Sequence, residues 1–91
     1  MKFKELEIKF NNAKLLSYKY VGVLSKLPYG TKPELRVHVS DDFDIAIKEY
    51  KKRYGNDLKH AFANVKIIDA MFANDLNDFE VMFDKFNENP Q

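Results

Sequence analysis

The stretch from Ser40 to Gly55 constrains the fold most, because every local signal in it indicates one α-helix. Carboxylates fill the expected first turn, where they oppose the positive end of the helix dipole: Asp41, Asp42 and Asp44. Apolar side chains recur at the spacing of one helical face: Phe43, Ala46, Ile47, Tyr50 and Tyr54. Three basic residues precede Gly55, which stands where a left-handed C-terminal cap belongs. We predict a helix with Ser40 or Asp41 as its N-cap.

Three strands are predicted ahead of this helix. Residues 2–10 alternate charged and apolar side chains, which is the pattern of a half-buried strand, and two asparagines then favour a hairpin turn. A second strand is predicted over residues 14–26, with Gly22 marking a bulge. Residues 27–33 hold two prolines and a glycine and are predicted to form a loop. Residues 34–39 alternate again and form the third predicted strand.

The last third of the chain fits two patterns. Apolar residues between 58 and 86 recur at helical spacing, yet residues 65–68 are mostly β-branched and residues 79–83 alternate. We favour a hairpin of residues 65–73 with 79–86 and leave two helices as the alternative, because periodicity alone does not separate them. Residues 87–91 are polar and are expected to be a flexible end of a single domain spanning residues 1–86.

The composition bounds the class of protein. The chain has 91 residues, is 45% hydrophobic and 32% charged, and carries a net charge of +1, which fits one small folded domain. It contains no cysteine, so disulfides, thiolate catalysis and iron–sulfur clusters are excluded. No signal-like segment and no long apolar run occur, and we expect a cytoplasmic protein without membrane contact. Lysine outnumbers arginine 13 to 2, which suggests an AT-rich genome such as that of a low-GC bacterium or its phage.

No catalytic, metal or cofactor site is predicted. His38 and His60 stand 22 residues apart, without a second ligand at helical spacing. The serines lack the glycine-flanked elbow of a nucleophile, and Ser40 is better explained as a helix cap. The three glycines are too dispersed to form a phosphate-binding loop. We therefore expect a protein that is not an enzyme.

The charges divide unevenly along the chain. Residues 1–40 carry +5 and residues 41–91 carry −4. In the basic half, tyrosines alternate with cations, and such a mixture suits single-stranded nucleic acid, whose bases stack on rings while lysines follow the phosphates. The predicted binding residues are Lys14, Tyr18, Lys19, Tyr20, Lys26, Tyr29, Lys32 and Arg36. The alternative is that Tyr18 and Tyr20 line the core and that the lysines protect a strand edge.

The predicted fold class is α+β, a small antiparallel sheet with one helix in the order β-β-β-α-β-β, the last two elements being helices in the alternative. This order resembles the OB-type barrel, which implies an oligonucleotide-binding sheet and binding loops. The predicted function is a small nucleic-acid-binding protein, for single-stranded DNA or RNA, of phage or mobile-element origin. The alternative is a protein-binding module or inhibitor, in one form a homodimer, with an interface at Ile67, Met71 and Phe72.

Overall fold

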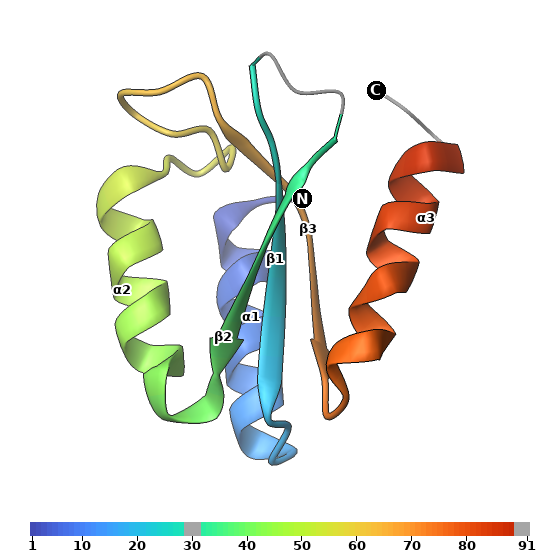
Figure 1. Cartoon of the computed structure of the whole chain (residues 1–91). Coiled ribbons are helices and arrows are strands. Elements are labelled where there is room, and N and C mark those ends of the chain that lie inside the picture. The colour runs from blue at the N-terminus through green and yellow to red at the C-terminus, as the bar shows by residue number, and fades with distance from the viewer. Residues whose placement is uncertain (29–31, 89–91) are drawn as a thin grey trace.

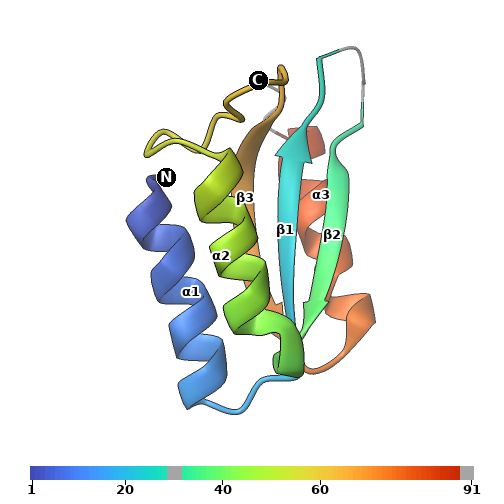
Figure 2. The same cartoon turned by 90° about the vertical axis from the view of Figure 1, so that its left-hand side faces the viewer.

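A three-stranded antiparallel sheet lies between two layers of helices in the computed structural model, which describes residues 1–28 and 32–88 (Figures 1 and 2). Helices α1 and α2 cover one face of the sheet and α3 covers the other. Two short 3₁₀ turns, Ser40–Asp42 and Leu76–Phe79, precede α2 and α3. The main elements in chain order are α1 (Phe3–Leu15), β1 (Tyr20–Lys26), β2 (Glu34–Val39), α2 (Phe43–Arg53), β3 (Lys66–Ala73) and α3 (Glu80–Glu88).

The sheet is open, with β1 in the centre and β2 and β3 at its edges. Both strand pairs are antiparallel, so β1 runs away from the end where α1 finishes and β2 and β3 return toward it. The α+β class with an antiparallel sheet is confirmed. The OB-like barrel is not formed, because the sheet does not close on itself and three helices, rather than one, cover its faces.

The strand predicted over residues 2–10 is wrong, because this segment forms helix α1. Four residues at helical spacing are buried on the face that packs against the sheet: Phe3, Leu6, Phe10 and Ala13. Leu6 and Phe10 satisfy both a strand period and a helix period, whereas Ile8, which only the strand period places inside, is 46% exposed. Lysine, glutamate and leucine also favour helices. The predicted asparagine turn therefore lies within α1, and the second strand shortens to β1.

The predicted C-terminal hairpin is half right. Residues 66–73 form β3, but this strand pairs with β1 and not with the residues that follow it. The segment after it begins with a 3₁₀ turn and continues as α3, where Phe79 and Met82, three residues apart, pack against Leu24 and Ala73. Burying this pair on the sheet outweighs the local strand-like alternation. Helix α3 runs on through Glu88, inside the segment predicted as a polar end, and residues 89–91 lie outside the description.

The third predicted strand and the central helix are confirmed as β2 and α2, although details of the caps differ. Helix α2 starts at Phe43, after the 3₁₀ turn, and no side chain caps its first N–H groups. None of the described glycines has a positive φ, so Gly55 is not a left-handed cap. The left-handed position lies three residues later, at Leu58, whose φ is 64°.

Gly22 has a different role from the predicted bulge. The register shift between β1 and β3 lies at Leu24 and Ser25. At Gly22 the ring of Phe79 packs directly onto the strand, and a Cβ atom there would stand 2.7 Å from two ring carbons. A glycine is required because a neighbouring ring approaches the backbone closely.

Candidate nucleic-acid interface and the adjoining groove

Three lysines stand in a row across three neighbouring chain segments. Lys26 of β1 is the register partner of Lys66 of β3, and Lys66 is bridged on its other side by Lys59. Residues paired directly across antiparallel segments point to the same side, with Cβ atoms about 4.5–5.5 Å apart. All three side chains are exposed. Like charges placed opposite one another destabilise a sheet, so this lysine row is a site where an anion is favoured.

A hollow of 420 Å³ lies beside the lysine row. All three lysines line it, and the other lining residues are Leu27, Pro28, His60, Ala63, Asn64 and Val65. No aspartate or glutamate is among its lining residues. Lys32 is exposed two residues before β2, whose first residue, Glu34, is the register partner of Ser25 next to Lys26. This end of the molecule therefore presents several cations beside a hollow whose lining includes no carboxylate.

The segment between α2 and β3 is held by a histidine. The backbone N–H groups of Phe62 and Ala63 both donate to Nδ1 of His60, at 3.0 Å each. Since Nδ1 accepts these hydrogen bonds, the neutral ring carries its proton on Nε2. The backbone N–H of His60 in turn donates to the carbonyl of Val65 at 2.9 Å. The side chain thus closes a tight turn and fixes the backbone around the exposed ring of Phe62.

Phe62 is the most exposed large apolar side chain described, at 91%. Its ring lies edge-on to the ring of His60, with the centroids 6.4 Å apart. The sequence analysis predicts no binding role for Phe62, because this residue shares the helical spacing of Leu58 and Val65. The small neighbours Ala61 and Ala63 were the available signal, since they provide little apolar surface for a buried ring to pack against.

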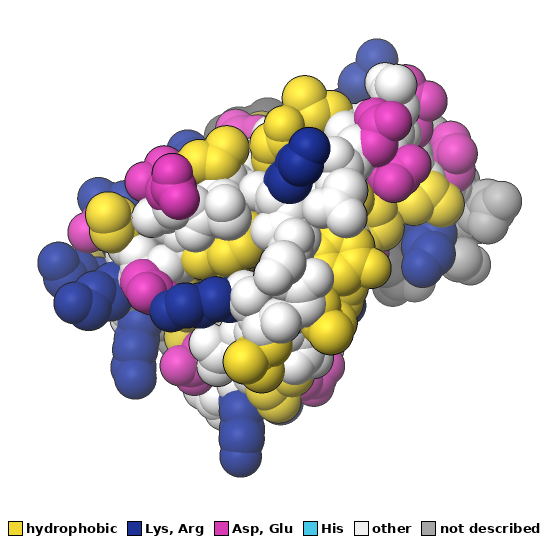
Figure 3. All heavy atoms as spheres, turned by 90° about the horizontal axis from the view of Figure 1, so that it is seen from below, with side chains coloured by type: hydrophobic (Ala, Val, Ile, Leu, Met, Phe, Trp, Pro, Cys, Tyr) yellow, Lys and Arg dark blue, Asp and Glu magenta, His cyan; other side chains and the backbone are white. Residues whose placement is uncertain are grey.

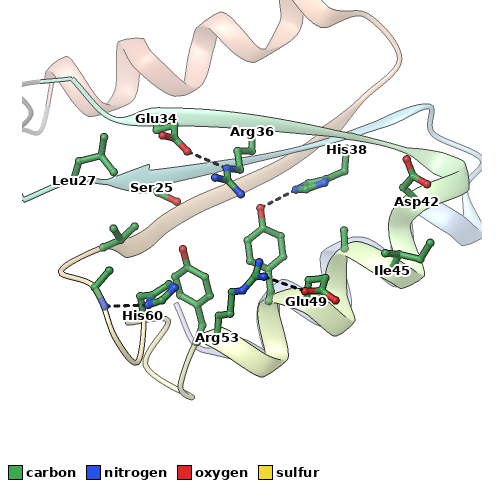
Figure 4. A pocket seen from close by; sticks show the side chains of 15 residues that line it. Ser25, Leu27, Glu34, Arg36, His38, Asp42, Ile45, Glu49, Arg53 and His60 are labelled. Atoms are coloured by element: carbon green, nitrogen blue, oxygen red, sulfur yellow. Dashed lines mark hydrogen bonds and ion pairs between the residues drawn. The ribbon is translucent and has the colours of Figure 1, made fainter.

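A larger groove of 700 Å³ separates β2 from α2 and shares His60 with the hollow. Figure 4 shows Arg36 and His38 projecting from β2 while Glu49 and Arg53 project from α2. Small side chains on both walls, Ser25 and Ala46 among them, keep the space open.

The charges in the groove largely compensate one another. Nε of Arg36 donates to Glu34 at 3.0 Å, and this hydrogen bond raises the pKa of the guanidinium further. Arg53 lies 3.5 Å from a carboxylate oxygen of Glu49, and Asp42 adds a third acidic group. A polyanion is therefore less favoured in the groove than at the lysine row.

A histidine–tyrosine pair closes the inner side of the groove. Nε2 of His38 and the hydroxyl of Tyr50 share a hydrogen bond of 2.7 Å. Burial lowers the pKa of His38, and the charge of Arg36 lowers it further, while Asp42 opposes the shift. Burial also raises the pKa of Tyr50 to about 12. Both groups therefore stay neutral at pH 7, and the pair ties the edge strand to α2.

The lowered pKa of His38 makes stability depend on pH. In the unfolded chain the pKa of His38 is about 6.5, and in the folded chain it is lower. As the pH falls, the unfolded chain therefore binds a proton before the folded chain does. Stability is lost as the pH falls from 6.5 toward the folded-state pKa. We expect the melting temperature to fall between pH 7.5 and pH 5.5, and to fall less in His38→Gln. Equal pH slopes for the two proteins would refute the assignment to His38.

The predicted binding residues do not meet on one face. Lys14 lies in the last turn of α1 and is paired with Asp44 at 2.9 Å, and Lys19 directly precedes β1. The end of α1 and the start of β1 lie at the end of the molecule opposite the end of β1 that carries Lys26 (Figure 1). Figure 3 views that opposite end, where cations are spread among carboxylates and apolar side chains. Among the members of the predicted set that the structure describes, Lys26 and Lys32 lie at the lysine-row end, while Arg36 lies in the groove.

The two described tyrosines of the predicted set are half-buried on opposite faces of the sheet. The ring of Tyr18 packs at a tilt against that of Phe72, with ring centroids 4.5 Å apart, and Tyr20 packs against the cluster under α3. Tyr29 lies outside the described residues. The predicted protein interface is not a common surface either, because Ile67 is buried and Met71 and Phe72 pack into the clusters on different faces.

Comparison with protein-family models, curated proteins and solved structures found no match to this chain. Among residues 1–28 and 32–88, no three aspartate, glutamate or histidine side chains group as metal ligands. None of the helices in this part of the chain is both long and apolar enough to span a membrane. The lysine row, Phe62 and the groove are the surface features of the described residues that bear on function.

Proposed function

We propose that this protein is a small non-enzymatic binding protein for single-stranded nucleic acid, which docks at the lysine row and Phe62. The observation that carries the proposal is the alignment of Lys26, Lys66 and Lys59 in adjacent register beside a hollow without carboxylates. Their mutual repulsion is relieved when phosphates lie among them, which releases counterions from the strand.

The exposed ring of Phe62 supports single strands over duplexes. A base whose faces are free can stack on an aromatic ring, and each such contact contributes about 1–3 kcal/mol. In a duplex the faces of the bases are already stacked on one another. Since Phe62 follows Lys59 by three residues and is held by the His60 turn, ring and cations are presented by one ordered segment.

Fluorescence anisotropy with labelled single- and double-stranded oligonucleotides, from about 50 to 200 mM salt, tests the proposal. Wild type is expected to prefer the single strand. Lys59→Gln/Lys66→Gln should make the slope of log affinity against log salt concentration less steep by about 1.4, since each phosphate contact on a single strand contributes about 0.7 to that slope. Phe62→Ala should weaken binding about 5- to 150-fold, the equivalent of one stacking contact.

The matched control is Lys14→Gln/Lys19→Gln, which removes the same charge at the opposite end of the molecule. It should leave the affinity near that of wild type, with at most a small general charge effect. Absence of binding at the lowest salt would overturn the proposal. Equal losses in the two double variants would show that binding follows net charge and not the lysine row.

A further inference from the structure

The two edges of the sheet differ in how they are protected. The β3 edge is disrupted by the register shift opposite Leu24 and is partly covered by the bridge from Lys59 and by the ring of Tyr18. Bulges, lysines and covering groups are how proteins blunt strand edges. Edge strand β2 pairs only with β1 in the described chain and contains neither a bulge nor a lysine. Its unpaired backbone groups form a template for another strand.

An apolar strip follows the same edge. Leu35, Val37 and Val39 alternate onto the face of β2 that lies on the side of α3. Helix α3 packs mainly over β1 and β3, so Val37 stays 38% and Val39 45% exposed. A partner strand that pairs with β2 would extend this apolar surface. It would also form hydrogen bonds with the unpaired backbone groups of the β2 edge.

We propose that the partner is a second copy of this chain, whose β2 pairs antiparallel with the first about a two-fold axis at Val37. This inference goes beyond the proposed function and does not depend on it. A slip by one residue would place apolar residues of one copy beside charged residues of the other. A two-fold axis at Arg36 would place the guanidinium groups opposite each other, which repels. The axis at Val37 instead sets Leu35 opposite Val39 and leaves Arg36 facing a neutral His38.

The charges that flank β2 are complementary in this arrangement. Lys32 precedes the strand, and Asp41 and Asp42 follow it, all three exposed and without an ion pair to any described residue. Symmetric pairing about Val37 places the start of each β2, which Lys32 precedes, beside the end of the other copy's β2, which Asp41 and Asp42 follow, so the attraction between the flanking charges occurs twice. The antiparallel arrangement also sends the two lysine rows to opposite ends of the pair, which separates the two strongly basic regions.

Sedimentation equilibrium over a wide concentration range tests the inference. The mass of wild type is expected to rise from the monomer value of 10.7 kDa toward twice that value. Val37→Lys places a lysine at the two-fold axis and should leave the protein monomeric. The matched control is Ile8→Lys, at another exposed apolar position, on α1, which should dimerise as wild type does. Circular dichroism verifies that both variants are folded.

A charge exchange tests the register. Lys32→Glu and Asp42→Lys should each weaken self-association, because each homodimer then opposes like charges twice. An equimolar mixture should recover the dimer, since every flanking pair in the mixed species is again of opposite sign. A wild-type protein that stays monomeric at the highest concentration overturns the proposal. A dimer that Val37→Lys leaves intact, or a mixture that shows no recovery, overturns the β2 register.

Discussion

Replacing Leu58 by alanine is expected to lower the free energy of unfolding by about 2–5 kcal/mol. Leu58 is fully buried and packs in the core between the sheet and helices α1 and α2. Its backbone, at a φ of 64°, is held by hydrogen bonds of 2.9 Å from its own N–H to Gly55 and from the N–H of Ile67 to its carbonyl. The side chain anchors a segment that otherwise consists mostly of exposed residues.

Urea unfolding followed by circular dichroism measures this loss. Phe62→Ala is the matched control, because it removes a large side chain from the same segment but one that is almost wholly exposed, and it should change stability by less than about 0.5 kcal/mol. Equal losses in the two variants would contradict the anchoring role of Leu58. Since Lys59 and His60 follow directly, Leu58→Ala is also expected to weaken oligonucleotide binding without itself contacting the strand.

Gly22→Val should destabilise the protein by about 1–3 kcal/mol or more through overpacking. Any Cβ at this position meets the Phe79 ring at 2.7 Å and a methyl carbon of Leu35 at 3.2 Å. The ring has no space to move into, because Phe79 is 1% exposed and packed against Met82. The added methyl groups would push α3 away from the sheet.

Thermal unfolding reports this effect, with each 1 kcal/mol shifting the melting temperature of a domain this small by about 4–8 °C. Gly55→Ala is the control, since its Cβ would meet the exposed carboxylate of Asp57 at 3.2 Å and the backbone carbonyl oxygen of Lys59 only at 4.0 Å. Gly22→Val/Phe79→Leu should recover part of the stability by reducing the ring that causes the clash. If the double variant were as unstable as the sum of the two single variants, the clash would not be the cause.

The dimer and the nucleic-acid interface are compatible in geometry. The lysine row lies across β1, β3 and the segment before β3, whereas the proposed pairing uses the far edge of the sheet. A long strand that reaches both lysine rows of a dimer would gain affinity through effective concentration without new contacts. Val37→Lys is therefore expected to reduce affinity for long oligonucleotides more than for short ones.

Helix α2 shows what local sequence determines. Its acidic first turn, apolar stripe and basic last turn are all signals within one segment, and they agree, so helix and stripe are predictable without the rest of the chain. The α+β class with an antiparallel sheet, and strand β2, were also predictable from such local patterns. In α1 and α3 the local signals conflict, because Leu6 and Phe10, or Phe79 and Phe83, fit a strand as well as a helix. Burial against the sheet then decides.

Less of the candidate site could be predicted from the sequence. Lys26, Lys59 and Lys66 form a row only because β1 and β3 are neighbours and the segment before β3 folds back on it. Lys26 was predicted as a binding residue because it lies near tyrosines in the basic half of the chain. Lys59 and Lys66 were not predicted, because they lie in the half of the chain with net negative charge. Composition and spacing determined which residues are charged and which segments are helical or extended. Strand pairing alone decided which charges meet, because register joins residues that are far apart in the chain.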